Sequence, residues 1–208
     1  MKQNYLRNWF AYWMQCVLGD KMQTLILVKH SLPEIVENVP ASEWRLSAEG
    51  QARSRRLADP LAKYHLDQII SSVEQKAKET AEILATELGL SASAFEGLHE
   101  HERNNVGYLS SDKFQEAVRE FFTRPDELVF GAETANQAHI RFRNAIHAVL
   151  SRSPDRTLVV VAHGTVISLF VSRLTGISDF SLWKELGCPS FIVLDMQSNR
   201  LIAKENIQ

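Results

Sequence analysis

The sequence has little cysteine, almost no net charge and no hydrophobic run long enough to cross a membrane. Cys16 and Cys188 are the only cysteines among 208 residues, and neither has a Cys or His neighbour at zinc-ligand spacing. A disulfide framework is therefore excluded and a reducing, cytoplasmic location is favoured. The formal net charge of −2 predicts no general attraction to nucleic acid. The apolar stretch over residues 9–18 is interrupted by Gln15 and is too short for a membrane span.

The chain divides into a short extension and one domain. Residues 1–21 are rich in aromatic side chains and differ in composition from the rest, and we expect them to lie outside the core. No repeat, low-complexity tract or linker divides residues 22–208, and this length suffices for one domain with a full core. A contact of the extension with a membrane surface or a partner, and a homodimer, are left open as alternatives.

Two apolar runs that each end in a histidine are the most informative feature. Residues 25–29 lead directly to His30, and residues 158–162 lead to His163. An unbroken apolar run of this length is typical of a strand that is covered on both faces in a parallel sheet. Ligands of such sheets bind at the carboxyl ends of the strands. Either histidine alone could be a strand-terminal residue with a satisfied hydrogen bond, whereas the pair favours a shared site.

The remaining pattern alternates strands and helices, which predicts a three-layer α/β sandwich with a mostly parallel central sheet. A terminal hairpin over residues 191–203 is expected to supply an antiparallel edge strand. The other expected strands are residues 66–70 and 95–98. The expected helices cover residues 46–58, 73–88, 112–122, 133–150 and 166–174, with Asp59-Pro60 ending the first and Ser71 or Ser72 capping the second.

The residues beside the two histidines predict a phosphate site. Lys29 precedes His30, Ser71-Ser72 end another strand, and Lys76 lies in the helix that follows. The free amides of that helix favour an anion as well. A histidine aimed into such a pocket could attack phosphorus and carry the phosphoryl group, while the cations and His163 stabilise its oxygens.

A leaving alkoxide needs a proton, which the segment from His99 to Arg103 can supply. It offers two carboxyls and two imidazoles as general acid. A bound phosphate would raise the pKa of a nearby carboxyl, so that it could be protonated near neutral pH. The alternative is a solvated, merely charged loop. Residues 32–45 and 101–130 are expected to form the mouth of the site, and Arg103 is a candidate substrate contact.

These segments resemble the histidine phosphatase superfamily, in its phosphoglycerate-mutase-like branch 1. The resemblance extends from Thr24 to about Asp195. It rests on motifs in the family's order: Val28-Lys29-His30-Ser31, Leu46-Ser47-Ala48-Glu49-Gly50, Ser71-Ser72 with Lys76, Ala77, Thr80 and Ala81, Leu98-His99-Glu100, Gly131-Ala132-Glu133-Thr134 and Ala162-His163-Gly164.

The resemblance implies a phosphatase that works through a phosphohistidine at His30, with Glu100 as proton donor and no metal or organic cofactor. His163, Lys29 and Lys76 would complete the phosphate pocket, with Ser31 and Ser72 as further substrate contacts. The chain departs from the family at both pocket arginines, which are lysines here. Lysine keeps the charge but loses the planar fork that holds two phosphate oxygens. A weak or inactive member that binds a phosphorylated small molecule or phosphoprotein is therefore the alternative function.

Overall fold

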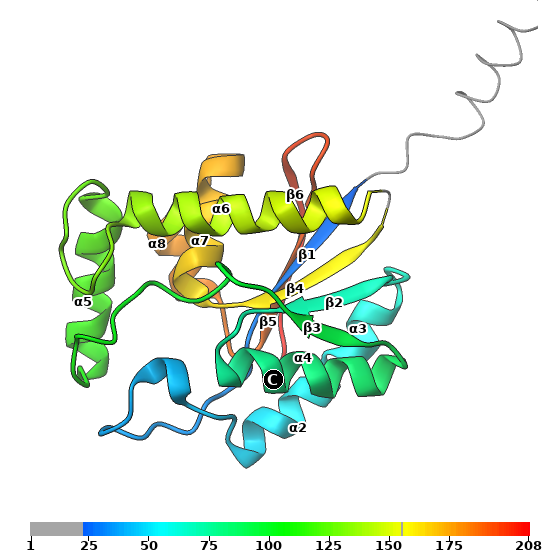
Figure 1. The fold of residues 1–208 in the computed structure, drawn as a ribbon, viewed down its shortest axis with the longest axis horizontal. Helices are drawn as coiled ribbons and strands as arrows, with labels where there is room; N and C mark the ends of the chain where they lie inside the picture. The colour runs from blue at the N-terminus through cyan, green and yellow to red at the C-terminus, as the bar shows by residue number, and fades with distance from the viewer. Residues whose placement is uncertain (1–22, 155) are drawn as a thin grey trace, which may run out of the picture.

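The two strands that precede the histidines lie side by side at the centre of one six-stranded sheet (Figure 1). The computed structural model describes residues 23–154 and 156–208. The strands follow the order β3-β2-β4-β1-β5-β6. Their bounds are β1 Thr24–Lys29, β2 Gln68–Ser71, β3 Ala92–Ala94, β4 Leu158–Ala162, β5 Ser190–Asp195 and β6 Arg200–Asn206. The first four strands in this order pair in parallel, whereas β5 is antiparallel to both β1 and β6. The predicted mostly parallel sheet with an antiparallel terminal hairpin is confirmed.

Helices cover both faces of the sheet, which explains the unbroken apolar runs. Leu25 and Leu27 of β1 pack toward α5 (Ser111–Thr123), α6 (Ala135–Arg152), α7 (Gly164–Thr175) and α8 (Asp179–Glu185). Ile26 and Val28 face the opposite layer of α3 (Ala58–Ala62) and α4 (Gln75–Leu88), against which α2 (Ala48–Arg56) packs. Because alternate residues of β1 enter two different cores, neither face can be polar. Every residue of β4 is buried as well.

Two predicted elements are wrong in their position. Residues 95–98 form a loop, and the edge strand β3 lies earlier in the chain. Gly97, with a φ of 84°, breaks the extended conformation there. The helix predicted over residues 46–58 is two helices, α2 and α3. Pro60 falls within the first turn of α3, where its missing amide has no partner to lose, so it does not end a helix.

The helix that follows β2 also begins later than predicted. Helix α4 starts at Gln75, with Glu74 as the residue before it, and Ser72 bonds to the Glu74 amide rather than capping a helix from residue 73. Lys76 therefore lies in the first turn of α4. This places its side chain beside the end of the sheet.

No helix in the part of the chain that the structure describes has the length and apolarity required to cross a bilayer. The expected extension over residues 1–21 lies outside the described residues. The connections that follow β1 and β3 extend toward the same end of the molecule, where the parallel strands end (Figure 1).

His139 of α6 predicts a specific loss of stability in acid. Burial lowers the pKa of His139 from 6.5 to about 4, and the nearby charges of Arg173 and Arg143 act in the same direction. Between these values an unfolded chain binds a proton that the folded chain does not, so the free energy of unfolding falls as the pH falls. From about pH 7 to about pH 4.5, we expect the wild type to lose about 1–2 kcal/mol more than His139→Gln.

Urea unfolding at a series of pH values measures this difference. His147→Gln is the matched control, because His147 lies on the same helix but is exposed. The control should follow the wild type. If His139→Gln follows it too, His139 does not carry this pH dependence.

Candidate active site

His30 and His163 meet at the carboxyl ends of β1 and β4. The His30 amide donates to the Ala162 carbonyl at 3.0 Å, so the parallel ladder continues to the first histidine. The two ring centroids are 5.1 Å apart with an interplanar angle of 60°. His30 is 7% exposed and His163 is fully buried. The register of the central strands thus brings together two side chains that are far apart in sequence.

The His30 ring is held as a neutral imidazole with one defined free nitrogen. Its Nδ1 lies 2.7 Å from the Ser31 carbonyl oxygen, which can only accept, so Nδ1 carries the proton. Burial lowers the pKa of His30 well below 6.5, and the nearby His163 and Lys76 lower it further. Near neutral pH, Nε2 therefore keeps its lone pair. This is the form that a nucleophilic histidine requires.

The segment around His30 is fixed by its neighbours. The Ser31 amide donates to Thr80 Oγ1 at 3.0 Å, while the buried Ser31 hydroxyl has no hydrogen-bond partner among the described residues. Helix α2 approaches so closely that a Cβ on Gly50 would lie 2.0 Å from the Leu32 carbonyl oxygen. Glycine is required at this position, which accounts for the Gly50 motif and fixes the path of the chain after His30.

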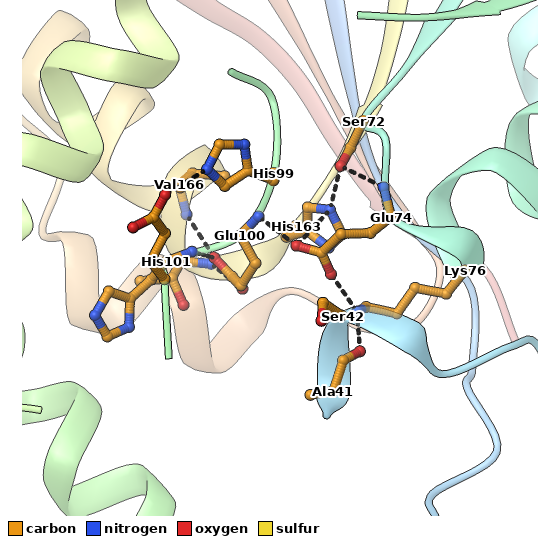
Figure 2. Close-up of polar contacts among 12 residues, drawn as sticks. Ala41, Ser42, Ser72, Glu74, Lys76, His99, Glu100, His101, His163 and Val166 are labelled. Atoms are coloured by element: carbon orange, nitrogen blue, oxygen red, sulfur yellow. Dashed lines mark hydrogen bonds and ion pairs between the residues drawn. The ribbon is translucent and has the colours of Figure 1, made fainter. Parts of the chain in front are cut away.

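His163 is held by the serine that ends the neighbouring strand. Its Nε2 lies 2.8 Å from Ser72 Oγ, and Ser72 also accepts a hydrogen bond from the Glu74 amide (Figure 2). His163 Nδ1 is buried and has no partner in the described part of the chain. Burial lowers the pKa of His163 well below 6.5. The ring is therefore neutral and can present Nδ1 to a ligand.

A buried carboxylate, Glu74, lies among these groups. One of its oxygens is 2.5 Å from Lys76 Nζ. The other accepts the Glu100 amide at 2.8 Å and lies 3.6 Å from His163 Nε2 (Figure 2). Glu74 thus contacts two of the groups that the sequence predicted to bind phosphate. Sequence reasoning missed it, although a glutamate between the Ser71-Ser72 pair and Lys76 was a visible signal.

Lys29 and Lys76, the two lysines expected in the phosphate pocket, are both hydrogen-bonded. Besides Glu74, Lys76 Nζ donates to the Ala41 carbonyl, which lies in the short 3-10 helix Ala41–Glu43. Lys29 Nζ donates to the Leu186 carbonyl at 2.7 Å. The Lys29 side chain also lies beside Gly164, where an added Cβ would be 3.3 Å from Lys29 Cε. Lys29 is therefore near the residue after His163, but its ammonium group points to the end of α8.

Glu100 lies at the amino-terminal end of α7, the helix that follows His163. Its carboxylate accepts hydrogen bonds from the amides of Thr165 and Val166, at 3.2 and 3.3 Å. It also accepts one from the His101 amide at 2.9 Å (Figure 2). Burial raises the pKa of Glu100, but the charge of Arg103 and the hydrogen bond from the His101 amide act in the opposite direction, and the pKa lies below its usual value. Glu100 is therefore ionised near neutral pH.

A buried ion pair positions the loop that carries Glu100. Arg141 of α6 contacts Glu133 and donates to the carbonyls of Gly97, His99 and Glu100. Glu133 in turn accepts the Glu102 amide at 2.9 Å. The sequence pattern predicts that Arg141 is a surface charge of its helix, which is wrong. Its part in positioning Glu100 follows only from the tertiary packing of α6.

The other candidate acids of this loop have their own partners. His101 is buried against the rings of Phe121 and Phe130, with centroids 4.1 and 4.7 Å away. One carboxylate oxygen of Glu102 lies 3.2 Å from His99 Nε2, within hydrogen-bond distance. Glu100 is therefore the carboxyl of the segment that lies nearest to the Glu74 and His163 cluster. No three metal-ligating side chains converge within residues 23–154 and 156–208.

A cavity of about 600 Å³ opens beside these groups, with Glu74, Glu100 and Arg103 in its lining. The ends of the parallel strands bring together two neutral imidazoles, a buried lysine and a carboxyl at a helix terminus. This combination of groups fits a site for phosphate chemistry. The family comparison agrees with this class. The model of the histidine phosphatase superfamily (branch 1) matches residues 25–205, and the chain belongs to this family.

Two similar sequences carry phosphatase names. The chain is 28% identical over 206 residues to phosphoserine phosphatase 1 of Hydrogenobacter thermophilus, covering 89% of this chain and 93% of the relative. It is 24% identical over 131 residues to the uncharacterized phosphatase PhoE of Bacillus subtilis, covering 63% and 65% of the two chains.

Solved structures share the fold at lower identity. A phosphoserine phosphatase from Entamoeba histolytica, in complex with 3-phosphoglyceric acid, superposes with a TM-score of 0.73 at 18% identity, covering 90% of this chain and 98% of that chain. A mycobacterial glucosyl-3-phosphoglycerate phosphatase in complex with VO3 gives 0.69 at 20% identity, covering 89% and 100%. These likenesses confirm the predicted phosphoglycerate-mutase-like α/β architecture.

Proposed function

We propose that the protein hydrolyses phosphate monoesters through a phosphohistidine at His30. The observation that carries the proposal is the state of the His30 ring. Its Nδ1 donates to the Ser31 carbonyl, its Nε2 has no hydrogen bond to another described residue, and its ring centroid lies 5.1 Å from that of His163. A nucleophile in this state needs no separate base.

In the first step, Nε2 attacks phosphorus and forms an N–P bond while the bond from phosphorus to the ester oxygen breaks. The departing alkoxide takes its proton from the Glu100 carboxyl. The bound phosphate carries negative charge, which raises the pKa of Glu100 above its value in the free protein, so the acid form becomes available. In the second step, the Glu100 carboxylate takes a proton from water, the water oxygen attacks phosphorus, and inorganic phosphate leaves His30 unmodified.

The transferred phosphoryl group needs donors for its three oxygens. His163 Nδ1 and the Ser31 hydroxyl are buried and have no partner in the described chain, so both are available to a ligand. Lys76 supplies positive charge at the same place. Ser72 acts through His163, whose orientation it fixes, while Lys29 would have to leave the Leu186 carbonyl to reach a phosphate oxygen.

A second candidate function is phosphate or phosphoprotein binding without turnover. The contacts of both lysines favour this function, because Lys76 forms an ion pair with Glu74 and Lys29 donates to the Leu186 carbonyl. A lysine also lacks the bidentate geometry that an arginine offers to the phosphoryl oxygens. A pocket built in this way could retain affinity for phosphate and lose most of its transition-state stabilisation.

Release of inorganic phosphate from a panel of esters separates the two functions. We expect the wild type to turn over at least some esters, and the double variant Lys29→Arg/Lys76→Arg to be faster by about tenfold or more, since paired charged hydrogen bonds are restored. Saturable phosphate binding without release over hours, and no gain in the double variant, would favour the binding function.

Removing the Glu74 charge should strengthen anion binding. Glu74 competes with a ligand for Lys76, and its negative charge lies 3.6 Å from His163 Nε2. In Glu74→Gln, we expect inorganic phosphate to bind about tenfold more tightly, which corresponds to about 1.4 kcal/mol. Calorimetric titration with phosphate measures the change.

Glu82→Gln is the control for the Glu74 variant, because it removes the same charge from an exposed position on α4, the helix that Glu74 precedes. Its phosphate affinity should equal that of the wild type. Unchanged or weaker binding in Glu74→Gln would show that Glu74 supports the anion site instead of competing for it.

A further inference from the structure

A second cavity, lined mainly by apolar side chains, adjoins the one that Glu74, Glu100 and Arg103 line. Its volume is about 530 Å³. It lies between the connection that follows β1 and the connection that leads from β3 into α5. Its apolar lining is formed by Ile35, Val39, Trp44, Tyr108, Phe114 and Phe130. Neither the phosphate chemistry nor the proposed function accounts for these side chains.

The two cavities are continuous in their lining. Ala41 and Arg103 border both, together with Asn104 and Asn105. The Ala41 carbonyl accepts a hydrogen bond from Lys76, so the apolar cavity begins where the proposed phosphate site ends. A phosphate ester whose phosphoryl group contacts Lys76 would therefore have the apolar cavity within reach of its alcohol part.

Arg103 lies at the junction of the two cavities, and one of its guanidinium nitrogens is available to donate a hydrogen bond. Its guanidinium carbon lies 4.5 Å from the centroid of the Phe114 ring, which holds the side chain by a cation–π contact. Arg103 Nη1 is buried and has no hydrogen-bond partner among the described residues. The geometry fits an anionic oxygen on one side of the guanidinium and an apolar group on the other.

The same two connections carry an unusual share of exposed apolar side chains. Ile35 is 57% exposed and Tyr108 is 51% exposed, and both line the cavity. Leu32 and Val36, from the first connection, are also exposed. Both connections lie at the end of the molecule where the parallel strands finish (Figure 1). Apolar surface gathered at the mouth of a pocket is a common mark of a ligand site.

We propose that the substrate is the phosphate monoester of an apolar alcohol with a ring-sized or longer hydrocarbon group, which fills this second cavity. The inference rests on the proposed function and deepens it. A small polar alcohol would leave the apolar lining exposed to water, whereas a hydrocarbon group would bury it. Arg103 would bind the phosphoryl or ester oxygen at the junction.

The test compares esters whose leaving groups are all primary alcohols, so that differences in the chemical step are small. We expect kcat/KM for benzyl phosphate to exceed that for phosphoserine and for glycerol 1-phosphate by about tenfold or more. In parallel, benzylphosphonate should bind at least about tenfold more tightly than methylphosphonate in calorimetric titrations. The phosphonates test the cavity without requiring turnover.

Substitutions of exposed residues that line the apolar cavity test whether this cavity causes the preference for benzyl phosphate. Ile35→Ser and Tyr108→Ser should each lower kcat/KM for benzyl phosphate by about fivefold or more, while the value for phosphoserine changes by less than about twofold. Ile202→Ser is the matched control, because Ile202 is 54% exposed but lies on β6, outside the cavity lining. It should alter neither value.

The outcomes distinguish this inference from the proposed function. Equal or better use of the polar esters, or equal binding of the two phosphonates, would overturn the apolar assignment even if the protein is an active phosphatase. Preferential binding of benzylphosphonate without hydrolysis of any ester would support the apolar cavity and end the proposed hydrolysis instead.

Discussion

Replacing His30 with alanine is expected to lower kcat for every phosphate monoester by at least about 1,000-fold, or about 4 kcal/mol of transition-state stabilisation. His30 forms the bond to phosphorus in the proposed mechanism. The other imidazole, His163, has Nε2 hydrogen-bonded to Ser72, and its Nδ1 is the proposed donor to the phosphoryl oxygens, so His163 does not replace His30 as the nucleophile. Steady-state release of inorganic phosphate measures the loss.

The His30 substitution has a close control. His139 is 7% exposed, as is His30, but it lies on α6 and contacts neither catalytic candidate in the structure. His139→Ala should keep kcat within about threefold of the wild type at neutral pH, because it removes a buried imidazole without touching the site. An active His30→Ala protein would remove His30 from the mechanism.

Glu100→Gln is expected to have the second largest effect, and the effect should depend on the leaving group. An alkoxide needs a proton as it departs, and general acid catalysis is worth about 100- to 10,000-fold. Glutamine keeps the size of the side chain but cannot donate an acidic proton. We therefore expect kcat for an alkyl phosphate to fall by about that factor, and kcat for a nitrophenyl phosphate to fall by much less, since its leaving anion is stable.

Glu102→Gln is the control for Glu100, because Glu102 is exposed and pairs with His99. It should leave both esters almost unaffected. Equal losses for the alkyl and nitrophenyl esters in Glu100→Gln would mean that this carboxylate supports the site, through its bonds to Thr165 and Val166, and does not donate the proton.

The lowered pKa values fix the direction of the pH dependence. His30 must be neutral to attack, and its pKa lies well below 6.5, so kcat/KM should hold as the pH falls through 6.5 and decline only at lower pH. Glu100 must be protonated in the first step, and its pKa in the free protein is lowered. The acid form is therefore supplied in the complex, where the bound phosphate raises the pKa.

The sequence predicted the sheet and the paired histidines because their signals are local. The apolar runs that lead to His30 and His163 are typical of strands covered on both faces, and the carboxyl ends of parallel strands lie at one edge of the sheet. The resemblance of the motifs to those of the histidine phosphatase superfamily identified the remaining candidate site residues. The predicted strand over residues 95–98 failed because one glycine with positive φ outweighed a short apolar pattern.

The parts that sequence reasoning missed depend on tertiary contacts. Glu74 enters the site because α4 begins at Gln75, two residues later than predicted, which turns its carboxylate toward Lys76 and His163. Arg141 donates to the Glu100 carbonyl and so positions the Glu100 loop. The periodicity of its helix predicts only that Arg141 is a surface charge. The apolar cavity arises where two long connections meet, and no pattern in either connection predicts how they pack.

The central claim is tested most directly by trapping the covalent intermediate. The protein is mixed with a reactive phosphate ester, quenched in alkali within the first turnovers, digested and mapped by mass spectrometry. The account predicts a phosphoryl group on the peptide that contains His30, labile in acid and stable in base, in the wild type and absent from His30→Ala. A phosphoryl group on another residue, or turnover with no adduct in any quench, would contradict it.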